Sequence, residues 1–372
     1  MRIGFDAKRA FMNASGLGNY SRNLLNALHL YSGKYQFVLY TPEIKTHLLK
    51  EQGRFEIHSP EKSLAKIFSP VWRNFGANRL KKHKINLFHG LSNELPKGIH
   101  KTGIPSVVTI HDLIFLRFPG FYPYLDRKIY YSKVKYACQS ANKIIAISQQ
   151  TKDDIIRFFG VDPEKIEIIY QPVSDAFFNP DIALGEKLLK KYSLRPDFIL
   201  SVGTLEPRKN QLAILKAIQK GKFTNQVVFI GKQQSYKHKL DRFIAENKLE
   251  KQVVFLHNLP EEELAALYKM AGCSVYISLF EGFGLPVIES MASGCPVITS
   301  NVSVLPETAG DAALLCEPGD IDGLVENLRI FLGNYKERIR WIEKGFERAN
   351  LFNSKDFAVR MTHLYDSIQI QS

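Results

Sequence analysis

The chain has 372 residues, of which 45% are hydrophobic and 23% charged, and this length suggests two globular domains with separate cores. No apolar run is long enough to cross a bilayer, and the N-terminus enters a strand without a signal-peptide region, so we expect a cytoplasmic protein. The formal net charge of +13 excludes an acidic, disordered chain. It indicates anionic partners: phosphorylated substrates, anionic lipid or nucleic acid.

The first half of the chain alternates β-rich and helical patterns. Strands are predicted at residues 2–5, 36–40, 87–89, 106–110, 143–147 and 166–169. Helices are predicted between them, notably at 20–31, 124–140 and 149–159. Such alternation is typical of a parallel sheet covered on both faces. A run of proline, polar and small residues at 170–175 and 179–180 then predicts a crossover into a second domain.

The second half repeats the alternation. After a helix at 184–192, strands are predicted at 198–203, 226–230, 253–256, 274–278, 297–299 and 313–315. Helices are predicted at 211–219, 236–247, 261–271, 286–293, 323–332, 334–348 and 354–368. We therefore predict an α/β protein with two Rossmann-like, doubly wound domains, 1–172 and 173–353, that face a central cleft, followed by a final segment, 354–372.

The run 280–290, Phe-Glu-Gly-Phe-Gly-Leu-Pro-Val-Ile-Glu-Ser, is the most informative segment. It follows a β-rich run and leads into a short helical stretch, so its turn aims a helix N-terminus beyond the strand end. Gly282 and Gly284 allow a close backbone approach and expose N–H groups. Pro286 suits the first helical position.

Two carboxylates flank this turn. Glu281 precedes it, at the strand end where ligands of open α/β sheets bind. Glu289 is predicted in the first helical turn, where the helix dipole favours a carboxylate by about 0.3–1 kcal/mol. The N–H groups suit phosphate and the carboxylates suit hydroxyls, and a nucleotide sugar carries both. The alternative, that both glutamates are solvated and the glycines only turn the chain, is disfavoured by the spacing and the flanking strands.

Two strand ends in the first half carry further candidates. Gly16 and Gly18 are predicted to turn the chain just before a helix, forming a second N–H nest, although a short glycine pair alone is a weak signal. His111 and Asp112 end the strand at 106–110. His111 could bind a substrate hydroxyl or carbonyl while Asp112 holds its ring, and a purely structural histidine is the alternative.

Adjacent cations end the first strand of the second half. Arg208 and Lys209 lie just before a helix that begins near Asn210. Arginine donates two parallel hydrogen bonds and lysine acts as a point charge, so together they suit a diphosphate. The alternative is a solvated basic turn.

Metal and cysteine chemistry find little support in the sequence. Asp320 and Asp322 form an acidic pair that could hold a divalent ion, but N-capping of the next helix explains them better, so no catalytic metal is predicted. The four cysteines lack the spacing of a metal site or a disulfide framework, and we expect core residues rather than nucleophiles: Cys138, Cys273, Cys295 and Cys316.

The basic residues cluster in two places. From Lys62 to Lys84 the chain carries seven basic residues and no acidic one, interleaved with Trp72 and other apolar residues, as in an interfacial helix. A second cluster interleaves tyrosines with Arg127, Lys128, Lys133 and Lys135. A surface helix packed on its own domain is an equally good interpretation. Nothing resembles a nucleic-acid-binding motif.

Taken together, the segments Gly16–Gly18, His111–Asp112, 206–210 and 280–290 resemble the retaining glycosyltransferases of family 4, also called glycosyl transferases group 1. This family adopts the GT-B fold of two Rossmann-like domains. The resemblance covers nearly the whole chain, in the expected order and spacing. The segment 280–290 is highly specific, whereas the N-terminal glycines are only supportive.

The resemblance implies two sets of site residues. The catalytic set is His111, Arg208, Lys209 and Glu281. The donor-binding set is Gly16, Gly18, Asp112, Gly282, Phe283, Gly284, Leu285 and Glu289. By this resemblance Glu289 binds the ribose, Glu281 contacts the transferred sugar, and the two cations stabilise the leaving diphosphate. His111 would lie near the reacting carbon, and the last helix would cross back to the first domain.

The function implied is transfer of a hexose from a GDP- or UDP-linked donor, without a cofactor or metal, to a glycan or lipid-linked acceptor. Mannose is favoured because the context of His111 is similar to that of mannosyl-type members. We expect the enzyme to take part in the biosynthesis of a cell-surface polysaccharide such as lipopolysaccharide. It would act in the cytoplasm, free or as a peripheral protein at the inner membrane face, with Lys62–Lys84 as a possible contact with anionic lipid. No nucleic-acid partner is expected. The alternatives are a GT-B phosphorylase or epimerase, or a non-catalytic membrane or nucleic-acid binder.

Overall fold

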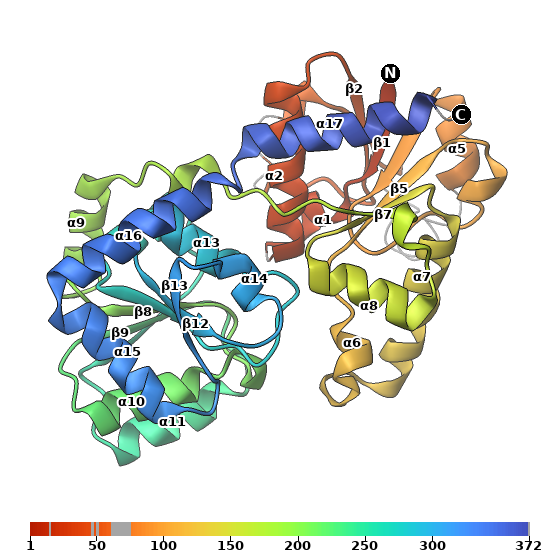
Figure 1. The fold of residues 1–372 in the computed structure, drawn as a ribbon. Helices are drawn as coiled ribbons and strands as arrows, with labels where there is room; N and C mark the ends of the chain where they lie inside the picture. Colours follow the sequence, from red (N-terminus) through yellow and green to blue (C-terminus); the bar gives the residue numbers. More distant parts are fainter. Residues whose placement is uncertain (15, 46–47, 50–51, 61–75, 371–372) are drawn as a thin grey trace. The chain divides into compact units, whose positions relative to one another are not determined.

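The computed structural model describes residues 1–14, 16–45, 48–49, 52–60 and 76–370. It divides into two compact units, one formed by Met1–Pro172 with Ser354–Ser372 and the other by Val173–Asn353 (Figure 1). Most of the predicted basic segment falls on 61–75, outside the described residues, and its last part forms α5, Gly76–Lys82.

The first unit contains a seven-stranded parallel sheet in the order β3-β2-β1-β4-β5-β6-β7. The strands are β1 Arg2–Asp6, β2 Gln36–Tyr40, β3 Glu56–His58, β4 Leu87–Gly90, β5 Ser106–Ile110, β6 Lys143–Ala146 and β7 Ile166–Ile168. Six of them confirm predicted strands, because central strands covered on both faces read as continuous apolar runs. β3 is not predicted, since this three-residue edge strand is partly exposed and carries no such run.

Helices cover both faces of this sheet. They are α1 Lys8–Met12, α2 Gly16–Tyr31, α5, α6 Ile114–Arg117, α7 Tyr124–Ser140, α8 Gln149–Phe159 and α17 Ser354–Ile370, with short 3-10 turns η1 Gln52–Arg54, η2 Ile99–Lys101, η3 Pro119–Phe121 and η4 Pro163–Lys165. The last helix, α17, packs against α2 (Figure 1). Its side chains Phe357, Met361 and Tyr365 are buried in the core with Leu24 and Phe5, so the C-terminal segment completes the core of the first unit.

The second unit contains a six-stranded parallel sheet in the order β10-β9-β8-β11-β12-β13. Its strands are β8 Ile199–Val202, β9 Val227–Ile230, β10 Val253–Leu256, β11 Cys273–Tyr276, β12 Val297–Ser300 and β13 Ala313–Cys316. Its helices are α9 Ile182–Lys191, α10 Gln211–Gly221, α11 Lys237–Glu246, α12 Glu261–Met270, α13 Leu285–Ala292, α14 Leu305–Ala309, α15 Ile321–Gly333 and α16 Tyr335–Asn350, with 3-10 turns η5 Asp175–Phe177 and η6 Pro207–Lys209. The predicted strands of this half are all confirmed within a few residues.

The strand order confirms the predicted fold class, because each sheet runs from its third strand inward to its first and then outward from its fourth. In the second unit the direction reverses between β8 and β11, which pair through Ile199 and Cys273. In doubly wound sheets, the connections on the two sides of such a reversal leave the shared edge in opposite directions. Open α/β sheets bind ligands at this reversal point, and it is where the residues of 203–210 and 277–284 begin.

Within the described part of the chain, no helix is both long and apolar enough to pass through a membrane.

Candidate functional site

Two glycines let the chain fold back over the end of β8. Gly203 follows the strand with φ at +149°, and a Cβ atom on Gly231, after β9, would lie 2.1 Å from the Gly203 carbonyl oxygen. Side chains are therefore excluded where these loops cross. The aliphatic part of Lys209 packs 3.6 Å from the position of a Cβ on Gly203. This close packing orients η6, and with it Arg208 and Lys209, toward the end of the neighbouring strand β11.

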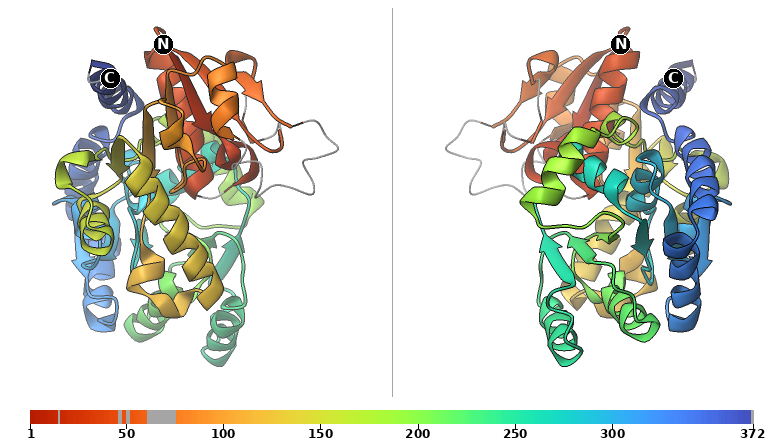
Figure 2. Two further views of the ribbon diagram at one scale, coloured as in Figure 1. Left: turned by 90° about the vertical axis from the view of Figure 1, so that its right-hand side faces the viewer. Right: turned by 90° about the vertical axis from the view of Figure 1, so that its left-hand side faces the viewer.

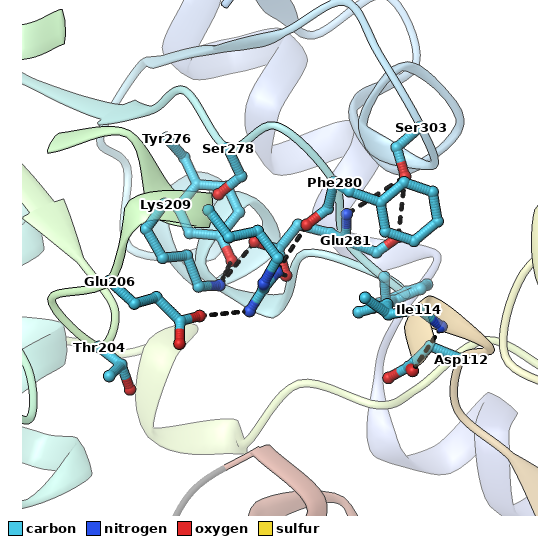
Figure 3. Close-up of polar contacts among 12 residues, drawn as sticks. Asp112, Ile114, Thr204, Glu206, Lys209, Tyr276, Ser278, Phe280, Glu281 and Ser303 are labelled. Atoms are coloured by element: carbon cyan, nitrogen blue, oxygen red, sulfur yellow. Dashed lines mark hydrogen bonds and ion pairs between the residues drawn. The ribbon is translucent and has the colours of Figure 1, made fainter. Parts of the chain in front are cut away.

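Glu281 holds both cations. Its Oε1 lies 2.6 Å from Nζ of Lys209, and its Oε2 lies 2.8 Å from Nη1 of Arg208 (Figure 3). Nη2 of Arg208 lies 2.6 Å from Oε1 of Glu206. The side chains of Arg208, Lys209 and Glu281 are only 19%, 12% and 9% exposed, so these ion pairs are shielded from bulk water. The sequence-predicted catalytic residues Arg208, Lys209 and Glu281 are thus brought into direct contact.

The charges of this cluster shift one another. Burial alone would raise the pKa of Glu281, but Lys209 and Arg208 outweigh it and lower that pKa to about 2. Burial lowers the pKa of Lys209 despite its contact with Glu281. For Arg208 burial also opposes the charge, yet the carboxylates of Glu281 and Glu206 raise the pKa overall. Two cations therefore face two carboxylates, and the cluster is formally neutral before any ligand binds.

The turn after Glu281 is braced from the helix α14 side. Gly284 caps α13 with φ at +101°, and a Cβ there would lie 2.7 Å from Leu305 Cδ2, so glycine is required. Ser303 Oγ donates to the Glu281 carbonyl at 2.8 Å, and Thr308 Oγ1 donates to the Phe283 carbonyl. The turn is fixed before any ligand arrives. Because α13 begins at Leu285, Pro286 occupies its second position rather than the predicted first.

Glu289 differs from its prediction. The first turn of α13 holds no acidic residue, so Glu289 lies beyond the reach of the helix N-terminus and the expected dipole stabilisation of its carboxylate is wrong. Burial, aided by Glu261, instead raises its pKa to about 8. Its side chain has no hydrogen-bond or ion-pair partner among the residues that the structure describes. A half-buried carboxyl group of this kind, protonated near neutral pH, can both donate to and accept from a hydroxyl.

The structure adds two residues that the predicted site lacks. The hydroxyl of Tyr276, at the end of β11, accepts a hydrogen bond from Lys209, whose Nζ also lies 4.7 Å from the Tyr276 ring centroid. Glu206 pairs with Arg208 as described above. Glu206 was visible in the segment 206–210, next to the cations. Tyr276 had no signal beyond its place at a strand end, because an apolar run hides which of its members faces the site.

In the first unit, His111 follows β5 and is buried, with 4% of its surface exposed. Its Nε2–H donates to the carbonyl of Leu91 at 2.8 Å, so Nδ1 is left as an acceptor, and the ring of Tyr20 packs edge-on at 4.6 Å. Burial lowers the pKa of His111 to about 4, so the ring is neutral at physiological pH. The predicted role of Asp112 as a support for this ring is wrong: Oδ1 of Asp112 instead accepts from the N–H of Ile114, the first residue of α6, at 3.1 Å.

The N-terminal glycines lie inside a helix. Gly16 and Gly18 form the first turn of α2 rather than a turn before it, which corrects the prediction. A Cβ on Gly18 would lie 1.7 Å from the carbonyl oxygen of Asn13, so that position requires glycine, whereas Gly16 faces open space. The N–H groups available to an anion there would be those of the α2 N-terminus itself.

The remaining predictions concern metal and thiol groups. Asp320 caps α15 by accepting from the Gly323 N–H at 2.8 Å, which confirms the N-cap, and Asp322 pairs with Lys220 at 2.6 Å. In the described ranges no three His, Cys, Asp or Glu side chains are grouped to hold a metal ion. All four cysteines are buried free thiols, as expected for core residues.

The predicted residues fall into two groups by unit. Arg208, Lys209, Glu281, the turn 282–285 and Glu289 belong to the second unit, and all lie on the loops and the helix that follow β8 and β11. Gly16, Gly18, His111 and Asp112 belong to the first unit.

Comparison with known proteins gives consistent results. The family profile described as "Glycosyl transferases group 1" matches residues 186–348, and that described as "Glycosyltransferase Family 4" matches residues 14–177. The chain is 29% identical over 292 residues to O-antigen chain mannosyltransferase B of Escherichia coli, covering 77% of this chain and 75% of that protein.

Two solved structures share the fold over its full length. Sucrose-phosphate synthase from Thermosynechococcus elongatus superposes with a TM-score of 0.82 at 20% identity, covering 100% of both chains. The Anabaena protein HepE, solved in complex with UDP-glucose, superposes with a TM-score of 0.78 at 17% identity, covering 99% of this chain and 100% of that one. At these identities the likeness shows the fold alone, and that fold is GT-B.

Proposed function

Because the chain belongs to the group 1 and family 4 glycosyltransferases, we propose that it transfers a hexose, with retention of anomeric configuration, from a nucleotide sugar to a glycan or lipid-linked acceptor. The observation that carries this proposal is the cluster of Arg208, Lys209 and Glu281 at the reversal point of the second sheet. It supplies preformed cations for a diphosphate and a carboxylate for sugar hydroxyls, next to the N-terminus of α13.

The barrier to transfer is departure of the nucleoside diphosphate from the sugar carbon. As the bond between that carbon and the phosphate oxygen breaks, its electron pair passes to the phosphate, and negative charge grows there. Arg208 and Lys209 are already oriented, so they stabilise this charge without reorganisation at the moment of reaction. This assigns the charge stabilisation to side chains and makes the transfer independent of a metal.

The carboxylates have separate roles in this scheme. Diphosphate takes over hydrogen bonds from Arg208 and Lys209 that Glu281 accepts in the free protein, which releases Glu281 to accept from hydroxyls of the transferred sugar. Glu289, whose pKa is raised to about 8 by burial, binds the ribose hydroxyls as a donor and an acceptor. His111, neutral and with Nδ1 free to accept, contacts the sugar, and the N-terminus of α2 with Gly16 and Gly18 approaches the phosphates.

The acceptor hydroxyl attacks the face that the phosphate leaves. A new bond forms between the acceptor oxygen and the sugar carbon, and the hydroxyl proton passes to the departing phosphate oxygen. No side chain has to act as a strong base, which agrees with the ion-paired state of Glu281. Retention follows because the incoming and the outgoing oxygen occupy the same face of the ring.

We propose mannose as the transferred sugar and a cell-surface polysaccharide such as lipopolysaccharide as the product. The support is the relationship to O-antigen chain mannosyltransferase B. The nucleobase is a separate question, because HepE, which shares the fold, was solved with UDP-glucose. GDP-mannose and UDP-glucose are therefore the two donors to compare first.

A panel of nucleotide sugars tests this function. The donor should raise the melting temperature, because ligand that binds only the folded state stabilises it. The matched variant pair is Arg208→Ala and Arg329→Ala, since Arg329 is an exposed arginine in the same unit. The donor's effect should be lost in the first variant and kept in the second. Release of nucleoside diphosphate with a glycosidic product separates transfer from phosphorolysis, and no response to any nucleotide sugar would refute the proposal.

A further inference from the structure

A patch of exposed apolar side chains lies on η3, on the residue before it and on the first half of α7 in the first unit. Its members are Phe118, Phe121, Tyr124, Leu125, Ile129, Tyr130 and Tyr131, which we call the α7 patch. Leu125 is 70% exposed and Ile129, one helical turn later, is 50% exposed, so the two lie side by side on the helix surface. The helix lies at the front of its unit in the left view of Figure 2.

Among the members of the α7 patch, Tyr130 and Tyr131 border the domain core: Tyr130 packs edge-on against the buried ring of Phe115, and Tyr131 lies beside Phe159. The second half of α7 is anchored by Val134, Ala137 and Cys138, which are fully or almost fully buried. In the first half every residue from 124 to 133 is exposed except Arg127, which is partly exposed. Single exposed apolar residues are common on protein surfaces, but a contiguous group of this size usually marks an interaction site.

The patch is interleaved with positive charge. The cations are Arg127, Lys128, Lys133 and Lys135, and Asp126 is the one acid in the helix. Lys128 Nζ lies 4.6 Å from the Tyr124 ring centroid, and Lys135 Nζ lies 5.7 Å from that of Tyr131. Lys133 pairs with Glu94 at 3.4 Å, but Lys128 and Lys135 form no ion pair with any residue that the structure describes. Long cationic side chains thus lie directly beside the aromatic members of the α7 patch.

This combination fits the boundary between lipid headgroups and acyl chains. Tyrosine and lysine place apolar stems in the boundary and polar tips in the headgroup layer. The first half of α7 exposes its residues all round the helix, and fluid lipids can adapt to such a surface without a preformed groove. Nucleic acid would use the cations and tyrosines, but it would leave Leu125 and Ile129 without a partner. The balance of charge selects anionic headgroups over neutral ones.

We propose that the α7 patch docks the protein on an anionic membrane surface, with Tyr124, Leu125 and Ile129 at the acyl boundary and Lys128 and Lys135 at the lipid phosphates. The sequence pattern suggested such a contact at Lys62–Lys84, where 61–75 lies outside the described residues. Among the described residues, the exposed apolar and basic surface lies on α7. This docking goes beyond the proposed sugar transfer and does not depend on it, because it involves no nucleotide.

Cosedimentation with vesicles tests the docking. Vesicles of equal parts phosphatidylglycerol and phosphatidylcholine should pellet the protein, and phosphatidylcholine vesicles should not. Lys128→Glu/Lys135→Glu should weaken binding at least about 30-fold, since each basic residue near the surface contributes about fivefold. Leu125→Ser/Ile129→Ser should weaken it about tenfold or more. Matched controls in the second unit, Lys187→Glu/Lys239→Glu and Ile182→Ser/Leu351→Ser, change equally exposed residues and should bind as the parent does.

A second readout does not rely on the stability of these double variants. Because all four native cysteines are buried, Ile129→Cys can be labelled with an environment-sensitive fluorophore, with Leu351→Cys as the control. The label at position 129 should shift to an apolar signal on anionic vesicles, and the label at position 351 should not.

Three outcomes would overturn the docking. They are no pelleting with anionic vesicles, pelleting that both α7 double variants retain, and a lipid-free dimer that these variants dissociate, which would make the patch a self-association surface. Melting temperatures with nucleotide sugars, measured on the same preparations, report the sugar-transfer site separately. A loss of docking with an intact nucleotide response would therefore leave the proposed function standing.

Discussion

Nζ of Lys209 lies 2.6 Å from Oε1 of Glu281, although 72 residues separate the two along the chain. They meet because β8 and β11, the strands that precede them, are neighbours in the second sheet. Both side chains are about nine-tenths buried, so the pair is shielded from water. The free protein thus holds the Lys209 ammonium beside a carboxylate that an anionic ligand must displace.

Replacement of Glu281 by glutamine should destabilise the free protein and strengthen its response to phosphate ligands. Without the carboxylate, Arg208 and Lys209 retain only Glu206 as an opposing charge, and breaking a buried pair on one side costs about 3–5 kcal/mol of unfolding free energy. Urea denaturation with and without pyrophosphate measures both effects. Pyrophosphate should raise the stability of Glu281→Gln more than that of the parent.

The matched control for this experiment is Glu326→Gln. Glu326 is 67% exposed and pairs with Arg329 at 2.8 Å, so its loss should cost no more than about 1 kcal/mol. Equal effects of the two substitutions would show that the buried pairing at Glu281 has no special energetic importance.

Replacement of Arg208 by alanine should lower kcat by about 10²–10³-fold, the usual effect of removing one preorganised donor from a developing negative charge. Steady-state turnover at saturating donor measures this, with Arg329→Ala as the exposed control. Pairing with Glu206 and Phe280 holds Arg208 in place, so its loss removes an oriented group rather than a mobile one. Turnover equal to that of the parent would exclude Arg208 from charge stabilisation.

Glu289 should make the protein less stable as the pH rises. Its pKa is about 8 in the folded state against a usual value of 4.5, so between these values the folded protein binds more protons than the unfolded chain. The free energy of unfolding then falls with rising pH across this window. The variant Glu289→Gln lacks this contribution. The free energy of unfolding of the variant minus that of the parent should therefore increase by on the order of a few kcal/mol as the pH rises from 4.5 to about 8.

Urea denaturation at several pH values between these limits measures the difference. Glu343→Gln, a change at an exposed glutamate of the same unit, should follow the parent at every pH. A constant difference between Glu289→Gln and the parent across the window would contradict the raised pKa.

Tyr365 on α17 should contribute to the stability of the first unit through a buried hydrogen-bond chain. Its hydroxyl lies 2.8 Å from Nδ1 of His89, whose Nε2 lies 2.9 Å from Oγ1 of Thr109, and the Tyr20 hydroxyl is 2.9 Å from the same Thr109 oxygen. The Tyr20 ring packs against His111, so the chain extends from the last helix to a candidate site residue.

The change Tyr365→Phe leaves one ring nitrogen of His89 buried without a partner, at a cost of about 1–3 kcal/mol. Urea denaturation should show this loss. Tyr335→Phe removes a hydroxyl from a side chain that is 69% exposed and should change stability by less than about 0.5 kcal/mol. If both variants unfold at the same urea concentration as the parent, the hydrogen-bond chain does not stabilise the unit.

Much of the fold could be predicted because strand and helix patterns are local. Strand β9 is an apolar run of four residues, β5 is rich in β-branched residues, and the helix α7 was predicted to its final residue. β3 could not be predicted, since its three residues acquire their strand conformation only by pairing with β2 at the sheet edge. Its stability comes from a neighbour and not from its own pattern.

The candidate site was predicted in part. The glycines and acids of 280–290 and the cations at Arg208 and Lys209 stand out in the sequence by residue type and spacing. The residues that support the site do not stand out. Tyr276 is one aromatic residue in an apolar strand, and Ser303, just before α14, and Thr308, on α14, are ordinary polar residues distant in sequence from the turn that they brace. Asp112 was predicted to support the His111 ring because the two residues are adjacent, but its carboxylate accepts a hydrogen bond from the Ile114 N–H.

The sequence by itself determined which elements form, in what order, and which residue types gather at the strand ends, because hydrophobic period and turn chemistry act over a few neighbouring residues. Only the tertiary structure decided the charge states of the two acids. Glu281 and Glu289 stand eight positions apart on one segment, yet the pKa of the first falls to about 2 and that of the second rises to about 8. The difference arises because the sheet order brings two cations to Glu281, whereas Glu289 pairs with no cation among the residues that the structure describes, and burial then penalises its charge.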